Sequence, residues 1–252
     1  MSQSKVIRQL RQAADSGDVE AMFNLGVAYY KGEGVPQDKA KAAQWFRKAA
    51  EMGETAAMFN LGVAYAAGTG VDRDPAQAVY WYRKAADQGS ALGMYNLGFF
   101  LSRGEGTPKN ENEALEWYRR AAEKGITRAM FSLGLAYKKG KGVPQDAAQA
   151  VHWFRKASEA GDTDGMCNLG MAYELGEGIP QDPAQAVHWY RKAADQGGSE
   201  GMFNLGSCLS HGEGVPQDEV QAVHWYRKAA DQGSLEAMNN LGVCLTQGKG
   251  AL

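Results

Sequence analysis

The segment Ala21-Met-Phe-Asn-Leu-Gly-Val-Ala-Tyr29 decides the fold of this chain of 252 residues, because it returns unchanged as residues 57–65. Its Leu-Gly pair recurs five more times at the same interval of 36 residues. The six tryptophans keep that interval too, at Trp45, Trp81, Trp117, Trp153, Trp189 and Trp225. An unbroken period of this length is the signature of a repeat protein.

Each repeat begins with a predicted amphipathic helix, here called helix A. In the first repeat Met22, Leu25, Gly26 and Tyr29 follow the i, i+3, i+4, i+7 spacing of one helix face. The segment Gly-Glu-Gly-Val-Pro-Gln-Asp at 32–38 then ends the helix, because paired glycines and a proline cannot continue it.

A second helix, helix B, completes each repeat. Asp38 is a good N-cap for it, Trp45 lies on its apolar face, and Gly53 ends it. The tryptophans and the Met-Leu-Gly face are predicted to form the core between stacked helix pairs, with the glycine allowing helix B to approach closely.

The ends of the chain fit the same pattern. Residues 1–17 match a helix B in which Gln9 replaces the tryptophan, as expected of an N-terminal capping helix, and residues 234–252 hold a last helix A. We therefore predict one all-α domain over 1–252, an α-solenoid superhelix of fourteen helices. Its full repeats are predicted at 18–53, 54–89, 90–125, 126–161, 162–197 and 198–233.

The common skeleton, A-M-F-N-L-G-V-A-Y-x-x-G-x-G-V-P-Q-D followed by W-[FY]-R-K-A-A-x-x-G, resembles the Sel1-like repeat family, which is related to tetratricopeptide repeats. The resemblance implies a protein-binding scaffold rather than an enzyme. Bacterial members of the family include adaptors, host-interaction factors and immunity proteins that neutralise secreted toxins.

The cysteines separate this chain from one branch of that family. Cysteine-rich members join helix A to helix B by a disulfide in each repeat, whereas here no helix B contains a cysteine. We expect Cys167, Cys208 and Cys244 to be free, and the penicillin-binding activity of that branch is not implied. A β-lactamase-like hydrolase stays as the least favoured alternative.

Composition limits the remaining function classes. A net charge of -2 and a pI near 6.1 give no general attraction for nucleic acid or anionic lipid, although an RNA-binding helical repeat remains an alternative. No apolar run approaches the roughly 18 residues of a membrane span, so we expect a cytoplasmic protein, or a periplasmic or secreted one if an export signal was removed.

No metal or cofactor site is predicted. His152, His188 and His224 occupy equivalent positions of neighbouring helix pairs. Such positions lie about 8–10 Å apart, too far to share a metal ion.

The candidate binding surface is found by comparing the repeats with one another. Positions that recur serve packing, whereas variable positions of helix A form a second stripe, predicted to line the concave surface. We call it the A-helix stripe; in the first repeat it contains Glu20, Phe23, Val27, Tyr30 and Lys31. The predicted partner-binding residues on it are Phe23, Phe59, Leu92, Tyr95, Phe99, Arg103, Arg128, Phe131, Lys138 and Lys139.

These residues predict the chemistry of the partner. Aromatic side chains follow much of the stripe, and basic residues gather near its middle. The pattern favours a protein or extended peptide with acidic groups facing the groove centre, with Phe99 and Arg103 in a hot spot. The alternative is that these charges only solvate the surface.

An asparagine precedes the Leu-Gly pair in six repeats of seven, with Ser132 as the exception. Asn60 and Asn96 are included among the predicted partner contacts, because a row of amides can hold a peptide backbone. Recurrence in nearly every repeat instead favours an internal hydrogen bond between neighbouring helices. Both interpretations remain open from the sequence.

Overall fold

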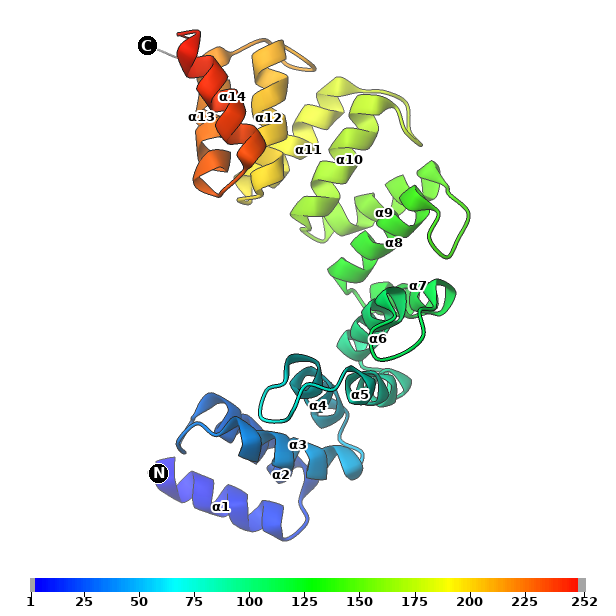
Figure 1. The fold of residues 1–252 in the computed structure, drawn as a ribbon, viewed down its shortest axis with the longest axis vertical. Coiled ribbons are helices and arrows are strands. Elements are labelled where there is room, and N and C mark those ends of the chain that lie inside the picture. The colour runs from blue at the N-terminus through cyan, green and yellow to red at the C-terminus, as the bar shows by residue number, and fades with distance from the viewer. Residues whose placement is uncertain (1–2, 249–252) are drawn as a thin grey trace. The chain divides into compact units, whose positions relative to one another are not determined.

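The structure, a computed structural model, describes residues 3–248, so residues 1–2 of the predicted cap and 249–252 of the last repeat lie outside it. Within this range the chain forms fourteen α-helices and no strand (Figure 1). The all-α fold of tandem helix pairs predicted from the repeats is thereby confirmed. The helices belong to two compact units, Met1–Ile126 and Thr127–Leu252.

The first unit contains the cap and three A/B pairs: α1 (Gln3–Asp15), α2 (Val19–Lys31), α3 (Lys39–Glu51), α4 (Thr55–Ala67), α5 (Pro75–Asp87), α6 (Ala91–Arg103) and α7 (Glu111–Glu123). Each helix packs on the next along the chain. Even-numbered helices are the A helices, and α1 takes the place of a helix B.

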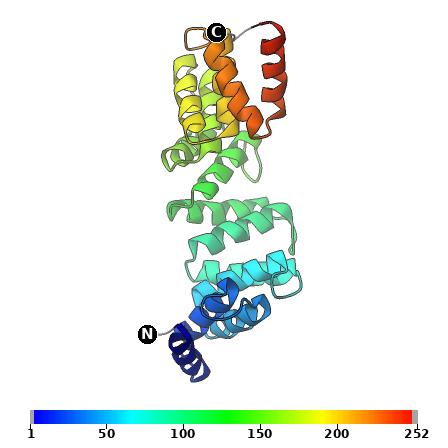
Figure 2. The ribbon, with the colours of Figure 1, turned by 90° about the vertical axis from the view of Figure 1, so that its left-hand side faces the viewer.

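The second unit repeats the scheme with α8 (Thr127–Lys139), α9 (Ala147–Glu159), α10 (Thr163–Leu175), α11 (Pro183–Asp195), α12 (Ser199–His211), α13 (Glu219–Asp231) and α14 (Leu235–Thr246). Here too consecutive helices pack together (Figure 2). Helix α10 also touches α12, the next A helix.

Side chains fix the ends of the helices. Asp38 accepts a hydrogen bond from the backbone N–H of Lys41 at 2.9 Å, as the N-cap prediction requires. Gly32 ends α2 in the left-handed conformation, with φ 76°. Gln37 Nε2 then donates to the carbonyl of Tyr30 at 2.8 Å and ties the loop to the helix that it leaves. The same bond recurs at Gln145, Gln181 and Gln217.

The Leu-Gly pair makes the closest helix–helix contact. Leu25 is fully buried, and a Cβ placed on Gly26 would lie 2.7 Å from ring carbons of Phe46 on α3. Because glycine has no Cβ, an aromatic ring of helix B rests directly on the backbone of helix A. We call this ring the joint ring; it is Phe46, Tyr82, Tyr118, Phe154, Tyr190 or Tyr226, with Leu10 at the same position of the cap.

The tryptophans are core residues, as predicted. Trp81, Trp117, Trp153 and Trp189 are buried, while Trp45 and Trp225 of the outer repeats are half-buried.

In several repeats a second contact joins helix B to a tyrosine of the following helix A. Arg47 donates to the hydroxyl of Tyr65 at 2.5 Å, and Arg155 donates to Tyr173 at 3.0 Å. In the third repeat Leu101 replaces the tyrosine and is buried, so Arg83 pairs with Glu113 at 2.6 Å instead. Leucine also replaces this tyrosine at Leu209 and Leu245.

The three cysteines are free and buried, as expected. Between residues 3 and 248 no helix is long and apolar enough to cross a membrane. The same range contains no group of three His, Cys, Asp or Glu side chains able to hold a metal ion, and His152, His188 and His224 are exposed.

Candidate protein-interaction site

The predicted partner-binding residues divide between the two units. Eight lie in the first unit: Phe23, Phe59, Asn60, Leu92, Tyr95, Asn96, Phe99 and Arg103. Four lie in the second: Arg128, Phe131, Lys138 and Lys139. Each group is described within its own unit.

Three aromatic residues of the A-helix stripe in the first unit, Phe23, Phe59 and Tyr95, are half-buried because each packs on the joint ring of its own repeat. The ring centroids of Phe23 and Phe46 are 5.8 Å apart, and those of Phe59 and Tyr82 are 6.1 Å apart. Tyr95 is likewise half-buried against Tyr118. One side of each ring therefore serves the core, and only the other side can meet a partner.

Leu92 and Phe99 occupy the stripe on α6. Leu92 is 49% exposed and can therefore contact a partner. Phe99 is half-buried beside Phe100, and the guanidinium of Arg103 lies 5.2 Å from its ring centroid. This is a cation–π contact, and it leaves Arg103 itself exposed.

A cavity of about 480 Å³ opens in the stripe of the first unit. We call it the α2–α4 cavity; it is lined by Tyr30 and Lys31 of α2, Lys39 and Phe46 of α3, and Phe59, Asn60 and Val63 of α4, with small residues between them. Tyr30 is 46% exposed and Val63 is 37% exposed. Two charged residues, Lys31 and Lys39, line the cavity, and both are basic. The cavity is therefore apolar with a basic rim.

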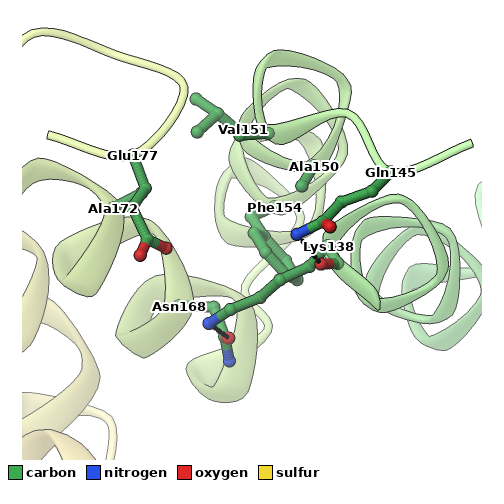
Figure 3. A pocket seen from close by; sticks show the side chains of 9 residues that line it. Lys138, Gln145, Ala150, Val151, Phe154, Asn168, Ala172 and Glu177 are labelled. Carbon is green, nitrogen blue, oxygen red and sulfur yellow. Dashed lines mark hydrogen bonds between the residues drawn. The ribbon is translucent and has the colours of Figure 1, made fainter. Parts of the chain in front are cut away.

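The second unit has a smaller cavity at the equivalent place, here called the α8–α10 cavity, of about 260 Å³. Lys138 extends across Phe154 toward Asn168, and its Nζ lies 3.4 Å from the amide oxygen (Figure 3). Glu177 lines the opposite side. This cavity therefore carries charge where the α2–α4 cavity carries Tyr30 and Thr69.

The two cavities occupy the same position of the repeat, because Phe46 and Phe154 are 108 residues, or three repeats, apart. A third cavity, of about 460 Å³, lies at the equivalent position between α1 and α2, where the joint residue is Leu10. All three are found where the joint residue has no phenolic hydroxyl.

The hydroxyl of a tyrosine joint ring points toward this same place. Tyr190 donates to Glu174 at 2.5 Å, and the Tyr118 hydroxyl lies 3.4 Å from the hydroxyl of Ser102. Glu174 and Ser102 are the equivalents of Tyr30 and Lys138. Phenylalanine at the joint therefore leaves open the space into which a tyrosine hydroxyl would project. The signal was present in the sequence, because Phe follows the tryptophan in two repeats and Tyr in four, but its meaning depends on where the hydroxyl points.

Two of the remaining predicted residues of the second unit, Arg128 and Phe131, already contact other side chains of the protein. Arg128 pairs with Asp164 at 3.6 Å, with both side chains largely exposed. Phe131 is half-buried against Phe154, with ring centroids 5.9 Å apart. Lys139 is exposed.

Acidic residues take the position of Arg128 in the next three repeats, at Asp164, Glu200 and Glu236. Loss of solvent around Glu200 raises the pKa of its carboxyl group. The negative charges of Asp164 and Glu236 raise this pKa further, and the positive charge of Lys138 lowers it. The stripe of the second unit thus becomes acidic along α10, α12 and α14.

The asparagine column has an internal role at one position. Asn168 is 9% exposed; its Nδ2 donates to the carbonyl of Asp164 at 2.9 Å, and its oxygen faces Lys138. Asn60 is half-buried and lines the α2–α4 cavity, and Asn96 is half-buried as well. For Asn60 and Asn96 the contact with a partner stays a prediction.

Comparison with known proteins gives the family. The Sel1 repeat model matches residues 19–54, 55–90, 91–126, 127–162, 163–198, 199–234 and 235–252. The chain belongs to the Sel1 repeat family. A search of curated proteins gives no match.

Solved structures of other Sel1 repeat proteins resemble this one. A Sel1 repeat protein from Oxalobacter formigenes is 31% identical, with 92% of this chain and 90% of that chain covered and a TM-score of 0.81. A protective antigen of uropathogenic Escherichia coli strains is 35% identical over 98% of this chain, with a TM-score of 0.72. This chain spans 61% of the length of that antigen.

A more distant relative in fold is an immunity protein from Pseudomonas aeruginosa, 20% identical, with 87% of this chain and 83% of that chain covered and a TM-score of 0.52. At this identity the similarity concerns the fold alone. Sel1 repeats thus provide a helical scaffold, and the residues that vary between repeats give this chain its own surface.

Proposed function

We propose that this Sel1 repeat protein is a non-enzymatic scaffold that binds a peptide or a partner protein along its A-helix stripe. The observation that carries the proposal is the α2–α4 cavity, an apolar hollow on the stripe with Tyr30 and Val63 exposed at its edge. Exposed apolar surface with a polar rim is typical of protein-interaction sites.

The chemistry of the stripe supports acidic groups on the partner. The exposed cations on the stripe include Lys31 and Arg103 of the first unit and Lys139 of the second, and Lys39 of α3 is exposed at the rim of the α2–α4 cavity. Arg128 contributes less, because Asp164 already balances its charge. A role in host interaction or toxin immunity fits the names of the similar Escherichia coli and Pseudomonas proteins and is proposed here only as the setting.

The test is affinity capture from the cell that produces the protein, comparing single substitutions of exposed residues. Val63→Asp and Leu92→Asp place charge on the stripe, at residues 37% and 49% exposed. Tyr80→Asp places it on α5, outside the stripe, at a residue 48% exposed. We expect a partner that wild type and Tyr80→Asp retain and both stripe variants lose. Equal retention by all four proteins would refute the assignment of the stripe.

A further inference from the structure

We infer that the α2–α4 cavity is an anchor pocket for one bulky apolar side chain of a partner peptide, with an acidic residue next to that anchor. The inference rests on the proposed function and specifies its ligand. It arises from three features of the cavity, namely its lining, the charge at its rim and the missing hydroxyl of Phe46.

The lining suits an apolar side chain. Phe46 is buried and forms the floor, while Phe59 and Val63 of α4 and Val27 and Tyr30 of α2 border the space. Its volume of about 480 Å³ falls in the range of roughly 300–1,000 Å³ that is usual for small-ligand sites. Asn60 is the uncharged amide of the lining and can accept or donate a bond to a peptide backbone.

The rim is positive. Lys31 and Lys39 are exposed lining residues, and no lining residue is acidic. The Lys31–Glu33 pair spans 3.6 Å between side chains that are 56% and 63% exposed, so it offsets little of the lysine charge. A carboxylate beside the anchor would lie near both lysines, which selects an acidic peptide over a basic one.

Phe46 keeps the space open. A tyrosine hydroxyl at this position would project toward Tyr30, as the hydroxyl of Tyr190 projects toward Glu174. Tyrosine occupies the joint at Tyr82, Tyr118, Tyr190 and Tyr226, so the fold accepts the substitution. Phe46→Tyr is therefore a change of one oxygen atom that partly fills the cavity and makes it polar.

The second unit supplies the matched control. Phe154 is also a joint phenylalanine, but Lys138 and Glu177 line the α8–α10 cavity and make it unsuitable for an apolar anchor. Phe154→Tyr adds the same oxygen atom at the equivalent position, away from the anchor pocket.

The experiment selects ligands from a displayed library of random dodecapeptides on the full chain. We expect enriched sequences to share a Leu, Ile, Phe or Trp next to Asp or Glu. The most enriched sequence, synthesised with a fluorophore, serves as the probe in fluorescence polarisation. Phe46→Tyr should weaken its binding at least tenfold, about the effect of expelling one buried apolar side chain, while Phe154→Tyr should change it less than twofold.

Val63→Asp provides a second variant, because Val63 is a surface residue and its change does not disturb the joint. It should also weaken the probe at least tenfold by placing a negative charge at the rim. Probe binding that both variants leave unchanged would overturn the anchor pocket, as would enrichment of basic peptides or of none. The proposed function would survive these outcomes if the stripe variants still lost the captured partner.

Discussion

Replacing the glycine of the Leu-Gly pair by alanine should change the stability of the protein in opposite directions at two positions, Gly134 and Gly242. At Gly134, a Cβ would lie 2.5 Å from two ring carbons of Phe154. At Gly242, the same position of the last repeat, a Cβ would meet nothing within 4 Å, because the described chain has no following helix B there. Both glycines belong to the second unit and to the same position of helix A, so the two sites differ in whether a joint ring rests on the glycine.

The magnitudes follow from these distances. Alanine in place of glycine in a helix stabilises by roughly 1 kcal/mol, and at Gly242 nothing opposes this gain. At Gly134 the new methyl group would intrude on the buried ring of Phe154, and overpacking of this kind costs about 1–3 kcal/mol or more. We expect Gly242→Ala to raise stability by about 0.5–1 kcal/mol and Gly134→Ala to lower it by about 1–2 kcal/mol.

The assay is urea unfolding followed by far-ultraviolet circular dichroism, with hydrogen exchange of α8 as a local readout. Repeat proteins can unfold in stages, so the exchange rates identify which helices each variant affects. A Gly134→Ala protein as stable as wild type would refute the argument that the glycine is needed for the joint ring.

Three further predictions concern stability. The Nε1 of Trp81 is buried without a hydrogen-bond partner among the described residues, whereas Nε1 of Trp117 donates to Glu113 at 3.3 Å. Gln77→Glu places a carboxylate at the position equivalent to Glu113. In thermal unfolding it should raise the stability of the protein by about 1 kcal/mol. No gain in melting temperature would contradict this. Burial raises the pKa of Cys208 to about 12 and that of Cys167 as well. Unfolded thiols ionise near pH 8.5, so the stability of the protein should fall as pH rises above about 8.5, and it should fall less steeply in Cys208→Ala. The thiols of the native protein should also react slowly with a disulfide reagent. Rapid labelling would contradict the burial of the cysteines. The raised pKa of Glu200 means that its charged form is disfavoured in the fold, so stability is lost as pH rises through that pKa. Glu200→Gln should therefore stabilise by about 0.5 kcal/mol at pH 7 and by nothing below about pH 4, and an equal gain at both pH values would exclude the electrostatic cause.

Much of the fold was predictable because the repeats are copies of one solution to the same packing problem. The spacing of Met22, Leu25 and Gly26 predicts the buried face of helix A, and the structure buries all three. The N-cap at Asp38 followed from local chemistry alone. These features depend on residues within one or two helical turns, which a sequence displays directly.

The candidate site was less predictable because its shape depends on contacts between repeats. The position that Phe23 and Phe59 occupy holds different residue types in other repeats and so belongs to the stripe. The rings of both residues nevertheless pack on the joint rings. The cavities arise where Phe46 and Phe154 lack a hydroxyl that other joints have, a difference of one atom whose direction only the structure gives. Asn168, one member of a regular column, is internally bonded because Lys138 happens to face it.

Photo-crosslinking can decide whether the A-helix stripe is the binding surface, with benzoylphenylalanine placed at Val63 and, as the control, at Tyr80 on the helix B side. After irradiation in the cell that produces the protein, we expect a protein adduct from position 63 and none from position 80, with the crosslinked partner peptide carrying acidic residues. Adducts of equal yield from both positions, or from position 80 alone, would contradict it.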